Sequence, residues 1–232
     1  MKARIVCWDI EATNLNADFG IILCCGFKEI GKKAEVFSIL DYNSGGDLIR
    51  AEKLLLRDMH KELMKADVWV CHFGCYYDIP FVNSRLLYHR LPLVPPNHPL
   101  VDTWKISRKK LKLRNNRLNT ISEFLKTDEH KNPIKPEQWT RALGGHKKSM
   151  QYIVEHCRRD VVVLDEVYQL LKPLETSHPN VSLMNGEKDG CRNCGSTDMQ
   201  LRGFSYTKAY RYRRYQCVTC GAWGRYGKNI PL

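Results

Sequence analysis

The sequence predicts an α/β domain over residues 1–175 and a small second domain over residues 190–232. Short apolar runs of high β-propensity alternate with longer segments whose apolar residues keep helical spacing. Residues 176–189 combine Ser, Pro, Asn and Gly with little apolar periodicity, which predicts a linker. Beyond this linker the composition changes and two C-x-x-C pairs follow. A chain of 232 residues has room for both units.

The composition is that of a globular protein with a strongly basic balance. Hydrophobic residues make up 43% of the chain and charged residues 27%, and the formal net charge is +12. This charge favours a polyanionic partner, of which nucleic acid is the commonest and an anionic membrane the alternative. The longest apolar run, 21–27, is too short for a bilayer, and Lys2, Arg4, Asp9 and Glu11 exclude a signal peptide. We therefore expect a cytoplasmic protein with no membrane partner.

The first predicted strand, 4–13, is an apolar run that ends in two carboxylates, Asp9 and Glu11. Successive side chains of a strand point to opposite faces, so these two acids share a face. Two acids on one face repel each other unless a cation lies between them, and a hard divalent ion such as Mg²⁺ takes oxygen ligands. The alternative is an edge strand with two solvated acids.

The rest of the first domain alternates predicted strands and helices. Strands are expected at 20–28 and 33–40, as a hairpin antiparallel to the first strand, and at 67–72 and 100–103. Helices are expected at 48–65, 78–90, 118–125 and 149–171. Residues 127–145 are predicted to be rich in loops. Residues 105–117 form a dense basic run, which is either a solvated face or a contact with nucleic acid.

Three further polar residues stand where a site could form. Asp78 opens a predicted helix directly after a buried strand, a position that commonly lines a cleft. His156 and Asp160 are four residues apart in the last long helix, so they share a helical face. Taken singly, Asp160 is equally explained as an exposed acid paired with Arg, and His156 as an ordinary core or surface histidine.

Together these segments resemble the three motifs of the DEDD 3′→5′ exonuclease superfamily. The motifs are residues 8–13 (WDIEAT), 72–81 (HFGCYYDIPF) and 156–161 (HCRRDV). The resemblance covers about the first three-quarters of the chain and implies a ribonuclease-H-like mixed sheet flanked by helices, as in the proofreading domains of family B DNA polymerases. It also implies that Asp9, Glu11, Asp78 and Asp160 hold two Mg²⁺ or Mn²⁺ ions around a phosphodiester, with His156 as the general base.

The chain departs from the superfamily in two places. One branch carries tyrosine four residues before the last Asp and another carries histidine five before it, whereas here His156 occupies the tyrosine spacing. Relatives often have asparagine where this chain has Phe73, so a polar contact near the substrate is expected to be missing. Asp102 recurs in relatives as a supporting acid.

Ten cysteines divide into six that lie singly or as a pair and four in the two C-x-x-C-G pairs. With no signal peptide, we expect reduced thiols. The four candidate ligands are Cys191, Cys194, Cys217 and Cys220. Four thiolates at this spacing predict a closed tetrahedral site for one structural Zn²⁺, a small zinc ribbon. The alternatives are two disulfides or a redox pair.

The segment between the cysteine pairs and the tail are rich in Arg and Tyr, and no acidic residue follows Asp198. Alternating aromatic and basic residues on a hairpin provide stacking surfaces and phosphate contacts. Half-buried tyrosines behind a small sheet, with solvated arginines, are the simpler alternative. We favour nucleic-acid binding, because both domains then share a partner.

The sequence thus predicts a metal-dependent 3′→5′ exonuclease that hydrolyses phosphodiester bonds by a two-metal-ion mechanism. We expect it to act on a single-stranded or 3′ end, with DNA favoured over RNA. A structure-selective endonuclease on the same fold and a catalytically silent nucleic-acid-binding module are the two alternatives. The chain shows no polymerase domain, so proofreading would need a polymerase partner in trans.

Overall fold

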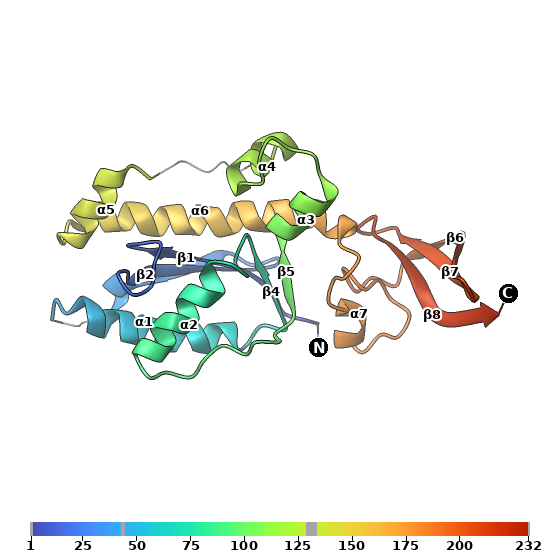
Figure 1. Cartoon of the computed structure of the whole chain (residues 1–232), viewed down its shortest axis with the longest axis horizontal. Coiled ribbons are helices and arrows are strands. Elements are labelled where there is room, and N and C mark those ends of the chain that lie inside the picture. Colours follow the sequence, from blue (N-terminus) through green and yellow to red (C-terminus); the bar gives the residue numbers. More distant parts are fainter. Residues whose placement is uncertain (1, 43–44, 129–133, 232) are drawn as a thin grey trace.

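The computed structural model describes residues 2–42, 45–128 and 134–231. The described residues form two sheets: a five-stranded mixed sheet with helices on both faces and a three-stranded antiparallel sheet beyond the C-terminal end of the longest helix (Figure 1). The first is the α/β sheet that the sequence predicts. The N-terminus lies near the junction of the two parts.

The strands of the large sheet are β1 (Ile5–Ala12), β2 (Ile22–Glu29), β3 (Ala34–Ser38), β4 (Val68–Cys71) and β5 (Leu100–Asp102). Their spatial order is β3-β2-β1-β4-β5. Strands β1, β2 and β3 pair antiparallel, whereas β4 is parallel to β1 and β5 is parallel to β4. The predicted hairpin antiparallel to the first strand is therefore confirmed, and β1 lies at the centre of the sheet rather than at its edge.

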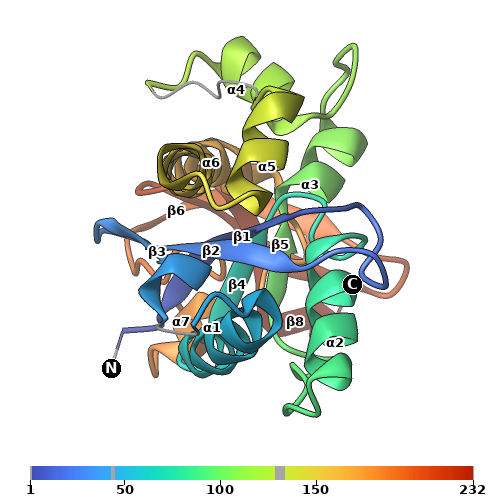
Figure 2. The same cartoon turned by 90° about the vertical axis from the view of Figure 1, so that its left-hand side faces the viewer.

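The helices are α1 (Leu48–Leu63), α2 (Asp78–Tyr88), α3 (Thr103–Lys110), α4 (Leu118–Leu125), α5 (Pro136–Leu143), α6 (Lys147–Leu171) and α7 (Val181–Met184). Short 3-10 turns lie at Ile39–Asp41 and Lys172–Leu174. Helices α1 and α2 cover one face of the sheet, and α6 with α3, α4 and α5 lies over the other (Figure 2). Within the described ranges, no helix is long and apolar enough to cross a membrane.

Strand β1 alternates between two environments. Val6, Trp8 and Ile10 pack in the hydrophobic cluster that includes the buried side of α1. Cys7 points to the opposite face, into the cluster formed with the C-terminal half of α6. Because side chains alternate along a strand, Asp9 also points to the face that α6 covers. The core packing of β1 thus directs its acids toward α6.

Helix α6 packs directly on β2 at Gly26. A Cβ atom at this position would come within 3.0 Å of both the Cys157 carbonyl oxygen and Val161 Cγ1. Gly26 is the register partner of Asp9, and the Cys157 thiol donates a hydrogen bond to the Asp9 carbonyl oxygen at 3.8 Å. The absence of a side chain at Gly26 therefore holds the helix close to the first acid of β1.

Three helices were not expected from the sequence. The basic run at 105–117 begins inside α3, and α5 lies in the segment 127–145 that was predicted to be loop-rich. Of that segment, residues 129–133 lie outside the described residues. Helix α7 lies in the predicted linker, where Val181 is buried. The predicted linker therefore contains packed structure.

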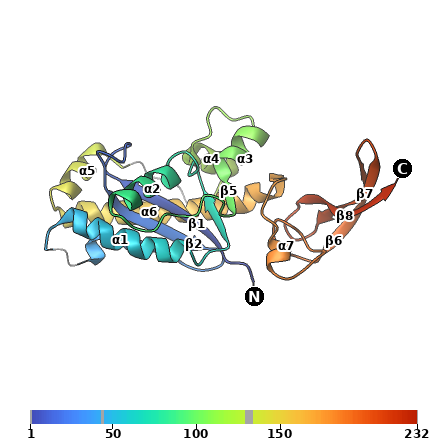
Figure 3. The same cartoon turned by 60° about the horizontal axis from the view of Figure 1, so that its bottom comes forward.

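The second sheet consists of β6 (Met199–Tyr206), β7 (Tyr210–Cys217) and β8 (Trp223–Pro231), in that order (Figure 3). Specific contacts join this part to the first. The Asn193 side-chain amide donates to the carbonyl oxygens of Lys172 and Glu175, at 2.6 and 2.9 Å, just after α6 ends. The Tyr168 hydroxyl lies 2.9 Å from Nε2 of the fully buried His178. These contacts hold the residues before the small sheet against the end of α6.

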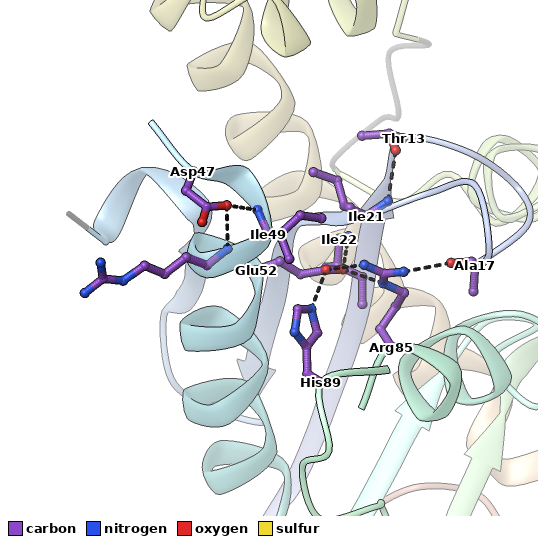
Figure 4. A network of polar contacts seen from close by, with 10 residues as sticks. Thr13, Ala17, Ile21, Ile22, Asp47, Ile49, Glu52, Arg85 and His89 are labelled. Atoms are coloured by element: carbon purple, nitrogen blue, oxygen red, sulfur yellow. Dashed lines mark hydrogen bonds and ion pairs between the residues drawn. The ribbon is translucent and has the colours of Figure 1, made fainter. Parts of the chain in front are cut away.

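A buried polar network joins α1, α2 and β2 (Figure 4). Glu52 on α1 is 0% exposed and lies on the apolar side of that helix. Its carboxylate accepts hydrogen bonds from Arg85 Nε and Nη2 at 2.9 and 2.5 Å, lies 2.7 Å from His89 Nε2, and accepts from the Ile22 N–H at 2.8 Å. A carboxylate with this many partners locks the two helices to the sheet.

Candidate active site

Asp9 and Glu11 lie near the C-terminal end of β1, where both side chains are partly buried. Their register partners on β2 are Gly26 and Cys24. On the other side β1 pairs with β4 only through Ile5–Cys7, so the ladder with β4 ends before the acids. The two carboxylates therefore stand at the carboxyl end of the parallel strand pair, where open α/β sheets bind ligands.

Helix α6 brings His156 and Asp160 to these acids. His156 Nε2 lies 3.6 Å from a Glu11 carboxylate oxygen and 3.4 Å from Asp160 Oδ2. Oxygen and nitrogen atoms of Glu11, His156 and Asp160 all lie within 4.8 Å of one another. Both α6 side chains are buried. The structure thus brings together three of the five residues that the sequence predicted, from elements far apart in the chain.

Asp78 contacts the same strand from α2, which lies on the face of the sheet opposite α6. It is the first residue of α2 and is buried, and its Oδ1 accepts a hydrogen bond from the Ile10 N–H at 3.3 Å. Ile10 is the residue between the two acids of β1. The helix N-terminus also favours a negative charge at this position.

Tyr77 is a site residue that sequence reasoning missed. Burial, and then the negative charges of Asp78, Glu11 and Asp9, raise the pKa of its hydroxyl to about 12. Tyr77 directly precedes Asp78, the first residue of α2. The hydroxyl donates to the Asn14 carbonyl oxygen at 3.3 Å. Its position directly before Asp78 in the second motif was the available signal.

The loop that follows β1 is held beside the acids. Besides Tyr77, Arg85 fixes it by donating from Nη1 to the Ala17 carbonyl oxygen at 3.0 Å. A cavity of about 600 Å³ lies between this loop and α2, and Tyr77 and Arg85 both line it. The buried network around Glu52 therefore continues to the border of the candidate site.

The donor set fits hard divalent cations. Glu11, Asp78 and Asp160 supply carboxylate oxygens, and Asp9 shares the strand face of Glu11. Mg²⁺ and Mn²⁺ prefer such oxygen ligands. Buried charges in proteins are paired or coordinate metals, so a group of acids that is largely removed from water suits a cation site. Glu11, His156 and Asp160 therefore fit one such ion, whereas Asp9 and Asp78 lie outside this group.

Asp102, predicted as a supporting acid, orders the surrounding backbone. Its Oδ1 accepts from the N–H groups of Phe73 and Trp104 at 2.9 and 3.0 Å, and its Oδ2 accepts from the Cys75 N–H at 3.4 Å. The carboxylate caps α3 and fixes the loop between β4 and α2. Asp102 thus connects the second motif to the basic helix.

The four cysteines of the C-terminal part form a compact cluster. Their sulfur atoms lie within 4.8 Å of one another, and the pairs Cys191–Cys220 and Cys194–Cys217 are each separated by 3.6 Å. A tetrahedral site with Zn–S bonds of about 2.3 Å has sulfur–sulfur edges of about 3.8 Å. Hydrogen bonds from the Cys194 and Cys220 thiols lower the pKa of Cys191, whereas the hydrogen bond to Cys191 raises the pKa values of Cys194 and Cys220. All ten cysteines lie in the described ranges as free thiols, so this cluster fits a zinc ribbon rather than two disulfides.

Comparison with known proteins identifies the family of the first 172 residues. Residues 6–172 match the family model of the RNase H superfamily. A PolC-type DNA polymerase III from Ureaplasma parvum is 31% identical over 147 residues, an alignment that covers 55% of this chain and 10% of the polymerase. The chain therefore spans about a tenth of the length of that relative.

A solved structure has a similar fold. The family B DNA polymerase from the hyperthermophilic archaeon Pyrobaculum calidifontis superimposes with a TM-score of 0.56 at 16% identity. The match covers 90% of this chain and 32% of the polymerase. The mixed sheet, the acids of β1 and α6 and the family match over most of the chain lead to one assignment: the chain belongs to the RNase H superfamily.

Proposed function

We propose that the chain is a metal-dependent 3′→5′ exonuclease that acts on single-stranded or frayed 3′ ends, with DNA as the favoured substrate. The observation that carries the proposal is the convergence of Glu11, His156 and Asp160, from β1 and α6, within 4.8 Å. Membership of the RNase H superfamily supports a nuclease, and the name of the PolC-type DNA polymerase III relative favours DNA.

The proposed mechanism assigns a role to each residue. Asp9, Glu11, Asp78 and Asp160 would hold two divalent ions, which when bound activate water and stabilise the leaving 3′ oxygen. His156 Nε2, held between Glu11 and Asp160, would accept the proton of the attacking water. The water oxygen would bond to phosphorus as the bond from phosphorus to the 3′ oxygen breaks. The terminal nucleotide would leave as a 5′-monophosphate, and the 3′ oxygen of the shortened strand would take a proton from solvent.

The test is digestion of a 5′-labelled single strand with Mg²⁺. An exonuclease of this polarity produces a ladder that shortens from the 3′ end, whereas a structure-selective endonuclease produces discrete internal cuts. A silent binding module leaves the strand intact. Blocking the 3′ terminus with a phosphorothioate linkage should stop the ladder, and degradation that continues from the 5′ end would contradict the proposal.

We expect His156→Ala to lower the rate by on the order of 10²–10⁴-fold, the usual contribution of a positioned base. His156→Tyr should recover part of this loss, because one branch of the superfamily that the chain resembles carries tyrosine at this position, four residues before the last Asp. The measurement is the rate against pH and against Mg²⁺ concentration. His60→Ala is the control, since His60 lies on α1, on the face of the sheet opposite α6, and contacts the Leu93 carbonyl oxygen at 3.1 Å.

The metal titration separates two roles for His156. A lost base lowers the maximal rate at saturating Mg²⁺ and removes the acidic limb of the pH profile. A lost metal ligand instead raises the Mg²⁺ concentration needed for half-maximal rate. An alanine variant with the wild-type rate and pH profile would show that His156 is only structural.

For the cysteine cluster we propose one structural Zn²⁺. Cys217→Ser should release the metal and unfold the small sheet, because thiolate zinc sites contribute directly to folding free energy. Zinc content and the appearance of tryptic cleavage within residues 190–231 are the measurements. Cys75→Ser should retain the full zinc content, since this thiol lies outside the cluster. A variant at Cys217 that keeps both its zinc and its protease resistance would exclude the site.

We further propose that the ribbon binds nucleic acid. Arg214 lies over the Trp223 ring at 5.0 Å and Arg225 over the Tyr212 ring at 4.2 Å. A cavity of about 730 Å³ beside them is lined by both arginines and by Arg192. Aromatic rings and guanidinium groups at one surface suit bases and phosphates.

Arg214→Gln and Arg225→Gln should each reduce the slope of log affinity against log salt by about 0.7 on a single strand. Fluorescence anisotropy at several salt concentrations is the measurement, with Lys53→Gln on the exposed side of α1 as the control. Point variants are preferable to truncation near His178, because truncation would remove Asn193 from the end of α6. If the slopes of log affinity against log salt do not change in these variants, we would infer that the ribbon binds a protein partner instead. The cytoplasmic location and a polymerase partner in trans stay predictions.

A further inference from the structure

Three aromatic rings form a partly exposed cluster on the loop before α2 and on α3. Phe73 and Tyr76 come from the loop before α2, and Trp104 is the second residue of α3. The ring centroids lie 5.1 Å apart for Phe73–Tyr76, 5.0 Å for Phe73–Trp104 and 5.5 Å for Tyr76–Trp104. Phe73 is 40% exposed and Tyr76 is 57% exposed. Rings that pack on one another yet remain in water leave a face for a ligand.

Cations flank the same rings. Lys105 Nζ lies 5.2 Å from the centre of the Tyr76 ring, and Arg108 Cζ lies 5.0 Å from that of Trp104. A cavity of about 470 Å³ is lined by these four residues and Lys109. The described residues that line this cavity include no acid. We call Phe73, Tyr76, Trp104, Lys105 and Arg108 the aromatic platform.

The backbone beneath the platform is held in an unusual conformation. Phe73 has φ +67°, in the left-handed region that an aromatic residue rarely occupies. The Asp102 carboxylate fixes it by accepting hydrogen bonds from the N–H groups of Phe73, Cys75 and Trp104. His72 adds a second tie, with Nδ1 2.9 Å from Thr103 Oγ1. Strained backbone persists where the surroundings enforce it, most often at functional sites.

We propose that the aromatic platform binds unpaired bases of the nucleic-acid strand whose end enters the candidate active site, so that the substrate is selected as a single strand. This inference rests on the proposed function and assigns the residues that hold its single-stranded substrate. Tyr76 and Tyr77 line the same cavity, and a Cβ atom at Gly74, next to Phe73, would lie 3.4 Å from Asp78 Oδ2. A strand stacked on the platform is therefore close to the acid that opens α2. The rings stack on bases, and the two cations contact phosphates.

Aromatic and cationic members of the platform should give different signatures in binding. Tyr76→Ala should weaken binding of a single-stranded 12-mer by about 5–150-fold, the usual loss for one stacked base, at every salt concentration. Lys105→Gln and Arg108→Gln should instead flatten the salt dependence by about 0.7 each. Phe124→Ala is the matched control, because Phe124 is 60% exposed on α4 and outside the cluster.

All variants are compared in the full-length chain carrying Asp9→Ala, without chelator, so that the strand stays intact and the cysteine cluster keeps its metal. Fluorescence anisotropy gives the affinity, and thermal melting verifies folding. Tyr76→Leu is a second variant, which retains apolar packing under Phe73 but cannot stack. It should bind as weakly as the alanine variant.

A scan with a single abasic site along the 12-mer tests the stacking directly. At one position of the strand, removal of the base should weaken binding to the chain that retains Tyr76. When the strand lacks this base, Tyr76→Ala should cause no further loss of affinity. Equal affinity for all abasic strands, or full additivity with Tyr76→Ala, would overturn the proposal. Binding is measured without hydrolysis. If the chain digests DNA but fails this scan, the platform proposal is rejected and the exonuclease proposal stands. If the chain passes the scan but does not digest DNA, the exonuclease proposal is rejected and the platform proposal stands.

Discussion

Asp9→Ala is expected to lower hydrolysis of a single strand by about 10³-fold or more, because a catalytic metal contributes several kcal/mol of transition-state stabilisation. Asp9 stands at the carboxyl end of β1, opposite Gly26 and under α6. Its side chain is not a core residue, so the variant should keep its melting temperature and its affinity for the strand. The measurement is single-turnover digestion at saturating Mg²⁺ or Mn²⁺.

Glu35→Ala provides the matched control for this experiment. Glu35 is an exposed acid of the same sheet, on the edge strand β3. It should leave the rate unchanged, so a general electrostatic effect of removing an acid can be separated from loss of the ion. An Asp9 variant that retains activity within a few-fold of the unsubstituted chain would exclude Asp9 as a metal ligand.

Glu52→Ala is expected to lower the free energy of unfolding by about 3–5 kcal/mol, because it leaves a buried guanidinium without its carboxylate and a buried imidazole without its hydrogen-bond partner. These two groups belong to Arg85 and His89, both buried. In a domain of this size the loss corresponds to a fall in melting temperature of roughly 6–20 °C. Calorimetry or urea unfolding gives the measurement.

Two further variants make the Glu52 test specific. Glu123→Ala removes an exposed acid that pairs with Arg114 at 3.3 Å, and it should cost at most about 1 kcal/mol. Replacing Glu52, Arg85 and His89 together by Leu, Met and Leu should recover much of the lost stability, because a buried ionic group can be exchanged for apolar side chains of similar volume. A loss below about 1 kcal/mol for Glu52→Ala would contradict the structural role given to the network.

Most of the site could be predicted because its signals are local. Asp9 and Glu11 end a clear β pattern, and His156 and Asp160 keep helical spacing in a long amphipathic helix. Which acids meet was implied by resemblance rather than by spacing. The structure supplies the distances, with Glu11, His156 and Asp160 in one group.

The elements that were missed have weak local signals. Helix α5 has only eight residues and buries none of them fully. Its apolar residues Trp139, Ala142 and Leu143 keep helical spacing over little more than one turn, which is too short a pattern to predict a helix. Glu52 was a detectable exception, since it interrupts the apolar stripe that includes Leu55 and Leu56. Its partner residues belong to α2, however, and no local pattern joins the two helices. The conformation of Phe73 likewise depends on Asp102, 29 residues away in the sequence.

The close contact at Gly26 has a consequence for how this chain can evolve. The two halves of the site are encoded about 150 residues apart, yet their separation depends on a residue that has no side chain and takes no part in the chemistry. Any larger residue at position 26 meets the backbone of α6 at 3.0 Å, which cannot move away without carrying His156 and Asp160 with it. A misplacement of about 1 Å can cost on the order of 10² in rate. We therefore expect Gly26 to be retained in lineages that keep the nuclease activity and to be substituted more often in lineages that have lost it. The residue at position 26 would then distinguish the two.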